Sequence, residues 1–338
     1  MTTTAKPAEL KPVELDLAAA EALPEEVSQV KVVLRRLFRH KLAVGSMIIW
    51  GIIILMAILA PEITAFKPQE IDLNQSFVSP GARSETGRIH WLGTDQIGRD
   101  YWTRILYAAR ISLTVAATAQ ASVTIIGILV GAISGYFGGW LDAVLMRFVE
   151  FLLTLPTLPI LLIISALLLQ NADAIPVPVV LQKFVGWLLI IPPRDSVQVI
   201  LLVLILVSLG WMGDSRLMRG GVLSVKEQTF TEAARALGAS DLRIILRHMV
   251  PNALAPMIVS ASLGLGGFII YEAALSFLGF GIQDPTPTWG NMLAAAESNM
   301  FQHPWLPLVA GTPIVLCTLT INFIGDGLRD ALDPRLKL

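Results

Sequence analysis

Residues 232–252 read EAARALGASDLRIILRHMVPN, a polar stretch with charges of both signs that lies between two long apolar runs. Thr229 precedes Glu232 by three positions, the spacing of a capping box, in which each side chain binds the free backbone N–H of the other residue. The Glu-Ala-Ala-Arg start favours a helix. Gly238 predicts the end of that helix, because helices commonly terminate at a residue with left-handed backbone angles.

The second half of the stretch predicts another short helix. Ser240 or Asp241 can cap it, and Pro251 marks its end. Its apolar positions on one side are Leu242, Ile245 and Met249. The stretch is therefore expected to form two short helices with a sharp corner, too polar to span a bilayer.

The composition of the chain is that of a membrane protein with several spans. Of its 338 residues, 54% are hydrophobic and only 15% are charged, which favours a polytopic membrane protein over a large soluble domain. The net charge of -1 gives no indication of nucleic-acid binding. The single cysteine, Cys317, excludes an intrachain disulfide and a cysteine-rich metal site.

Six apolar runs predict an all-α bundle of about six transmembrane helices. The runs cover residues 42–63 and about 111–135, 141–169, 197–211, 253–279 and 306–325. Lysine and arginine gather before the first run, after the fourth and after the last, so the positive-inside rule places both termini and residues 214–252 in the cytosol. Residues 1–41 then form a cytosolic tail with a basic flank and a short surface helix around Leu15–Leu23. Residues 64–110 form an external loop, and residues 111–338 form the core.

The external loop is expected to end in a helix at the membrane surface. Gly93-Thr94-Asp95 is typical of a turn and a helix cap. The next apolar positions, Ile97, Tyr101 and Ile105, share one helical face. This pattern predicts an interfacial helix that leads into the span beginning near residue 111.

Small residues and prolines predict the packing of the next two spans. Gly127, Gly131 and Gly135 recur at four-residue spacing, which allows a neighbouring helix to approach closely. Pro156 and Pro159 should bend the third span, because each lacks an N–H for the helical ladder.

Residues 170–195 separate the third and fourth spans. The apolar patch within them, Phe184–Ile191, is too short to cross a bilayer. We expect an interfacial insertion on the outer side of the membrane.

The stretch 232–252 resembles the coupling loop of the membrane subunits of ATP-binding-cassette (ABC) importers, with Glu-Ala-Ala, three residues, Gly, then apolar positions and Pro. The resemblance implies a cytosolic loop that docks into a groove on an ATPase subunit. The residues expected to couple the two subunits are Glu232, Ala233, Ala234, Arg235, Leu237, Gly238 and Ala239. The alternative is an ordinary amphipathic loop.

Three further motifs resemble one subgroup of this family, the permeases for dipeptides, oligopeptides and nickel. They read HWLGTDQIGRD at residues 90–100, EAALSFLGFG at 272–281 and PTWGNM at 287–292. The resemblance implies the MetI-like transmembrane fold of a type I ABC importer. It also implies a subunit that forms half of the translocation path for peptides or a related small substrate such as a nickel chelate.

The same resemblance implies the partners and the location of the chain. The partners are a homologous second permease, two ABC ATPase subunits and an external substrate-binding protein, in the plasma (inner) membrane of a bacterium or archaeon. ATP and magnesium would lie on the ATPase subunits, so this chain is expected to bind no cofactor and to be no enzyme itself. No lysine of the chain follows a glycine as the phosphate-binding loop requires.

Glu272 is an acid within an apolar run. Ionisable groups in such runs usually face a cavity or a partner, so Glu272 is a candidate pore or gate residue. The alternative is a structural hydrogen bond to a neighbouring helix. The same two alternatives apply to Gln120 and Asn322.

Two other classes of protein compete with the permease hypothesis. A stand-alone secondary transporter or channel should carry paired intramembrane charges or an internal repeat, and the sequence indicates one clear intramembrane acid and no repeat. An intramembrane enzyme needs a catalytic cluster. The four histidines, His40, His90, His248 and His303, are scattered without metal-ligand spacing.

Overall fold

The computed structural model describes residues 29–169, 171–172 and 175–333, and the described chain is almost entirely helical. The helices are α2 (Gln29–Arg39), α3 (Lys41–Ile58), α4 (Ala60–Ile63), α5 (Tyr101–Phe137), α6 (Gly139–Leu153), α7 (Thr157–Leu169), α8 (Val179–Leu189), α9 (Pro193–Lys226), α10 (Thr229–Ala236), α11 (Asp241–Ile244), α12 (Val250–Phe277), α13 (Trp289–Glu297) and α14 (Trp305–Leu332). The two strands, β1 (Ala82–Arg83) and β2 (Ile89–His90), pair antiparallel. The surface helix expected around Leu15–Leu23 lies outside the described residues.

The expected all-α membrane fold is confirmed. Five helical segments are long and apolar enough to cross a membrane, or up to six if the bent pair α6 and α7 counts as one span. The helix of the fourth predicted span is longer than its apolar run, because α9 continues to Lys226 beyond Trp211. The charged part of α9 stays helical because it packs against α5 along much of its length.

The prolines break the third span, as predicted. Helices α6 and α7 meet at an angle of 88°. Pro156 lies in the short gap between them, and Pro159 falls in the first turn of α7, where a missing N–H costs little.

The glycines of α5 form the predicted close helix contact, and the neighbour is α9. A Cβ atom at Gly127 would lie 2.5 Å from the Cβ of Asp214, and one at Gly131 would lie 2.3 Å from the carbonyl oxygen of Ser215. One at Gly135 would lie 3.0 Å from the carbonyl oxygen of Arg219. The two backbones therefore approach more closely than side chains at these positions would allow.

The cap predicted for the helix after the external loop is wrong. The helix α5 begins at Tyr101, and Asp100 caps it by accepting hydrogen bonds from the N–H and the hydroxyl of Thr103 at 2.8 and 2.6 Å. Gly98, with φ +78, separates Asp95 from this helix. No separate interfacial helix precedes the span, because α5 runs unbroken from Tyr101 to Phe137.

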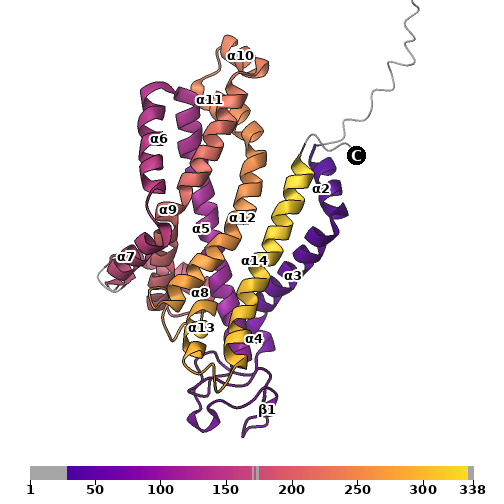
Figure 1. The fold of residues 1–338 in the computed structure, drawn as a ribbon, viewed down its shortest axis with the longest axis vertical. Coiled ribbons are helices and arrows are strands. Elements are labelled where there is room, and N and C mark those ends of the chain that lie inside the picture. Colours follow the sequence, from indigo (N-terminus) through magenta and orange to yellow (C-terminus); the bar gives the residue numbers. More distant parts are fainter. Residues whose placement is uncertain (1–28, 170, 173–174, 334–338) are drawn as a thin grey trace, which may run out of the picture.

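The long helices run between two ends of the molecule (Figure 1). One end carries α10, α2 and the last turns of α14, and the other carries β1, α4 and α13. The insertion helix α8 packs against α9. Both ends of the described chain thus lie at the end of the bundle where α10 is found.

Candidate coupling surface

The first helix of the stretch 232–252 is α10, Thr229–Ala236, followed by a turn at Gly238 with φ +79. Its predicted capping box is wrong. Gln228 is the N-cap and supplies no side-chain hydrogen bond, while Thr229 is already the first helical residue. The hydroxyl of Thr231 donates instead to the carbonyl of Val225 at 2.9 Å, which ties α10 to the end of α9.

The second helix does not end at Pro251. The helix α11, a π-helical turn Ile245–Met249 and α12 follow one another without a gap and form a single helical segment, Asp241–Phe277. In the π-helical turn the N–H of Val250 donates to the carbonyl of Ile245. This wider turn precedes Pro251, which therefore occupies the first turn of α12, where a proline is tolerated.

Apolar side chains fix α10 and α11 to the bundle. Ile244 and Met249 are fully buried in a cluster with Met218 and Val222 of α9 and Ala132 of α5. Two of the predicted coupling residues, Ala234 and Ala239, pack against the same cluster. Ile245 is also buried, but Leu242 is 66% exposed, so the prediction that Leu242 shares the buried side is wrong.

Polar contacts at Tyr136, near the end of α5, join the four helices that meet at this surface, α5, α9, α10 and α11. The Tyr136 hydroxyl donates to the carboxylate of Asp241. The ammonium of Lys226 donates to the carbonyl of Tyr136 at 2.7 Å, and the guanidinium of Arg235 lies 6.0 Å from the centre of its ring. These contacts hold α10 and α11 in one orientation relative to α5 and α9.

The outward side of α10, α11 and the turn between them, which we call the coupling surface, is exposed and carries both charged and apolar side chains. Glu232, Ala233, Arg235 and Gly238 are exposed beside Leu237, which is 88% exposed. Further exposed apolar side chains are Phe230, Leu242 and Leu246. Large apolar side chains among charges of both signs, on a rigid support, are typical of a surface that binds another protein.

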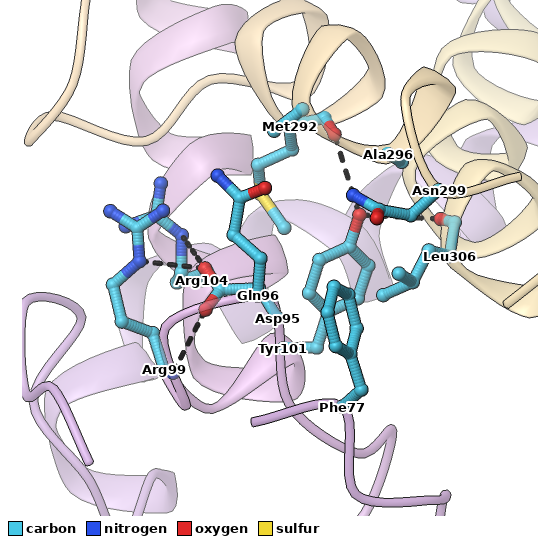
Figure 2. Close-up of a pocket in the computed structure, with 11 residues that line it drawn as sticks. Phe77, Asp95, Gln96, Arg99, Tyr101, Arg104, Met292, Ala296, Asn299 and Leu306 are labelled. Atoms are coloured by element: carbon cyan, nitrogen blue, oxygen red, sulfur yellow. Dashed lines mark hydrogen bonds and ion pairs between the residues drawn. The ribbon is translucent and has the colours of Figure 1, made fainter. Parts of the chain in front are cut away.

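The motif at residues 90–100 builds a buried network at the opposite end of the molecule. His90 contacts Asp100 at 2.8 Å and Gln75 at 3.0 Å. Arg99 binds the Asp95 carboxylate at 2.6 Å, an interaction drawn in Figure 2. The motif therefore holds the external loop onto the start of α5.

A second carboxylate extends this network to the loop before α13. Asp284 accepts hydrogen bonds from Arg104 at 2.8 Å and from Arg99 at 3.1 Å. Burial alone would raise the pKa of Asp284, but the charges and hydrogen bonds of Arg104 and Arg99 bring it below its ordinary value.

The cavity beside this network is too small for a substrate. It has a volume of about 10 Å³ and is lined by Tyr101, Arg104, Met292 and neighbouring residues (Figure 2). That volume is at the lower limit for a single water molecule. Tyr101 closes it by donating weakly to the carbonyl of Leu306 at 3.3 Å. Across the described ranges, no group of three or more His, Cys, Asp or Glu side chains is placed to hold a metal ion.

Comparison with known proteins identifies the family. The profile described as "Binding-protein-dependent transport system inner membrane component" matches residues 127–338, and that of the "N-terminal TM domain of oligopeptide transport permease C" matches residues 28–80. The chain belongs to this family of transport-system membrane components.

Full-length relatives agree with this membership. The permease is 38% identical to the dipeptide transport system permease protein DppC of Alkalihalophilus pseudofirmus, over 92% of this chain and 91% of the relative. It is 37% identical to the oligopeptide transport system permease protein OppC of Haemophilus influenzae, over 89% and 87% of the two chains. The family resemblance drawn from residues 90–100, 232–252, 272–281 and 287–292 is confirmed.

Glu272 of the permease lies inside the helix packing and is completely buried. The Ser276 hydroxyl donates to its carboxylate at 2.9 Å, and the hydroxyls of Ser112 and Thr288 are its other polar neighbours. The residue thus lies where α5, α12 and the start of α13 meet. Its pore or gate role stays a prediction.

A second acid buried among the long helices, Asp214, was not predicted as a functional residue and lies at the start of the stretch 214–252 that the sequence places in the cytosol. Asp214 lies within α9, is 6% exposed, and accepts hydrogen bonds from Ser260 at 2.8 Å and Thr124 at 3.2 Å. Gln120 donates to Thr124 at 2.9 Å and extends this polar chain along α5. The available signal was an acid next to the apolar run of α9, but its partners on two other helices cannot be paired from the sequence.

Proposed function

We propose that this chain is the transmembrane permease subunit of an ATP-driven ABC importer for peptides, and that it forms half of the translocation path. The single observation that carries the proposal is the coupling surface, an exposed and rigidly held pair of helices in a multi-pass bundle. Family membership supports it, and the relatives named above are dipeptide and oligopeptide permeases. Those relatives give no support for a nickel chelate as the substrate.

The coupling surface suits a separate motor because its outward and inward sides differ. Glu232 and Leu237 are exposed and can enter a groove on an ATPase. Ala234 and Ala239 face the cluster shared with α5 and α9. A force applied to the outward side therefore acts directly on the helices of the bundle, and binding of ATP biases the bundle between two arrangements.

The proposed assembly contains a homologous second permease, two ABC ATPase subunits and an external substrate-binding protein. ATP and magnesium are bound by the ATPase subunits, so this chain binds no cofactor and hydrolyses no ATP. The assembly lies in the plasma (inner) membrane of a bacterium or archaeon with both termini of this chain in the cytosol. The position of α2 and the end of α14 at the α10 end of the bundle supports this orientation (Figure 1).

Two substitutions at the coupling surface test the proposal, one that reverses a charge and one that adds a large side chain. The variants Glu232→Lys and Gly238→Arg should leave the permease in the membrane but should prevent ATPase subunits from co-purifying with it, and peptide uptake should fall to background. The matched control is Glu85→Lys, because Glu85 is an exposed acid in the external hairpin at the opposite end. It should retain the ATPase subunits.

Normal uptake by both coupling variants would refute the proposal. A stand-alone transporter or channel predicts that result, because it needs no ATPase. Labelling that places Leu237 on the side of the membrane away from the ATPases would also refute it.

Glu272 is assigned a supporting role in this proposal. Its burial among the hydroxyls of three segments suits a contact that holds α5, α12 and α13 together. Glu272→Gln should then lower stability without changing which peptides are transported. A changed peptide preference at unchanged stability would favour the pore or gate role.

A further inference from the structure

Arg110, in the outer part of α5, is half-buried and has a guanidinium nitrogen without a hydrogen-bond acceptor. Arg110 is not part of the network of Arg99 and Arg104. Its Nη1 atom is buried and has no hydrogen-bond acceptor in the described part of the chain. A guanidinium is always charged, and arginines in membrane spans pair with an acceptor almost without exception. The described residues therefore leave this nitrogen open to an acceptor from the surroundings of the chain.

Arg110 lines one of two adjoining grooves. The first, of about 630 Å³, is lined by Arg110, by Gly186, Trp187 and Leu188 of the insertion helix α8, and by Ile190, Ile191 and Pro192 after it. The second, of about 670 Å³, is lined by Lys67–Glu70, Tyr107, Ile190 and Pro192. The grooves share Ile190 and Pro192, so we treat them as one surface, the Arg110 groove.

The charges around the Arg110 groove favour an anion. Lys67 lines the groove as a second cation. The acid in its lining, Glu70, is already bound by Arg88 at 2.7 Å, and that hydrogen bond lowers the pKa of Glu70. The carboxylate of Asp195, on the first turn of α9, lies 3.4 Å from Arg194. Neither acid is bound to Arg110.

The walls of the groove favour a ligand with an apolar part. Trp187 is 76% exposed, and Leu188 and Ile190 beside it are also exposed. Phe184, one turn before Leu188, is 56% exposed and adds to the same apolar side of α8. Exposed tryptophan on an apolar helix beside a membrane span is typical of the level where lipid headgroups meet hydrocarbon.

We propose that the Arg110 groove binds a phospholipid of the surrounding bilayer, with a preference for a net anionic headgroup. The phosphate accepts hydrogen bonds from the Arg110 guanidinium, Lys67 adds electrostatic attraction, and the acyl chains lie along Trp187 and Leu188. A phosphate with an apolar tail matches both properties of the groove, the unpaired buried donor and the exposed apolar wall. The insertion between the third and fourth spans, to which the coupling function gives no task, builds this wall.

Native mass spectrometry of the intact transporter tests the proposal. The complex is purified from membranes, stripped with detergent, and returned to nanodiscs of phosphatidylglycerol or of phosphatidylcholine before lipid adducts on the permease are counted. Wild-type permease should retain phosphatidylglycerol at least fivefold more often than phosphatidylcholine. Arg110→Gln should lose that difference, and Arg110→Lys should keep most of it because it keeps the charge.

The matched control is Arg194→Gln. Arg194 is close in sequence to the groove, but its side chain is 84% exposed and lies beside Asp195. It should retain the wild-type preference. Trp187→Ala, which removes apolar wall and no charge, should reduce retention of both lipids.

Equal retention by wild type and Arg110→Gln would overturn the proposal, as would equal retention of the two lipids by the wild type. Loss of the second permease from the Arg110→Gln complex, with lipid retention unchanged, would show that a protein carboxylate is the missing partner and would also overturn it. Arg110→Lys is the control for misfolding, because the complex should still assemble and still bind lipid.

Discussion

Replacing Gly131 by alanine tests the contact between α5 and α9 most directly. The added Cβ would lie 2.3 Å from the carbonyl oxygen of Ser215 and 2.7 Å from the Cβ of Met218. Ordinary contacts begin at about 3.4 Å, so the two helices must separate by about 1 Å at this point. Both nearest atoms belong to helix backbone or to the rigid start of a side chain, so neither can rotate away.

The expected cost follows from two opposing effects. Overpacking of this kind typically costs about 1–3 kcal/mol. Alanine also stabilises a helix relative to glycine by about 0.5–1 kcal/mol. The net loss in the free energy of unfolding should be about 1 kcal/mol, within a range of about 0–2.5 kcal/mol.

The matched control is Gly213→Ala, on α9. A Cβ at Gly213 meets nothing within 4 Å, so only the gain in helix stability remains. Unfolding of the two purified variants in mixed micelles should therefore differ by about 2 kcal/mol, with Gly213→Ala the more stable. Equal stability of the two variants would refute the argument that helix proximity, rather than glycine itself, matters at position 131.

Three further substitutions have expected outcomes. Asp100→Ala removes the cap of α5 and the partner of His90, and should lower the free energy of unfolding by about 2 kcal/mol, measured by denaturation in mixed micelles. The folded-state pKa of Asp284 is lowered, so its contribution to stability is present above its unfolded pKa and is lost as the pH falls through the folded value. The difference in melting temperature between wild type and Asp284→Asn should shrink below about pH 4. Tyr136→Phe removes the hydrogen bond to Asp241 and should reduce peptide uptake by the reconstituted transporter while ATP hydrolysis continues. Unchanged uptake would show that coupling does not depend on this hydrogen bond.

Much of the fold could be predicted because it depends on local chemistry. A long apolar run must be helical in a bilayer, so the spans can be located from the composition of each run. The spacing of Gly127, Gly131 and Gly135 predicted a close helix contact, although it could not name α9 as the neighbour. The turn at Gly238 was predictable because only its own backbone angles decide it.

The features that could not be predicted depend on contacts between distant parts of the chain. The network of Asp95, Arg99, Arg104 and Asp284 joins residues up to 185 positions apart, and no spacing rule connects them. Pro251 by itself predicts a helix end, but it follows a π-helical turn and lies in the first turn of α12, where a proline is tolerated. The predicted coupling residues fall on one surface, but which of them face the bundle depends on the cluster around Met249.

The unbroken passage from α11 through the π-helical turn into α12 has a mechanical consequence. The segment Asp241–Phe277 has 37 residues, and at about 1.5 Å per residue it is about 55 Å long. If this segment moves as a straight rod and tilts by about 5° about its Asp241 end, its far end is displaced by about 5 Å, roughly the rise of one helical turn. In the assembly proposed above, a small movement of the ATPases would thus become a displacement on the opposite face of the membrane that is large enough to change the width of an opening.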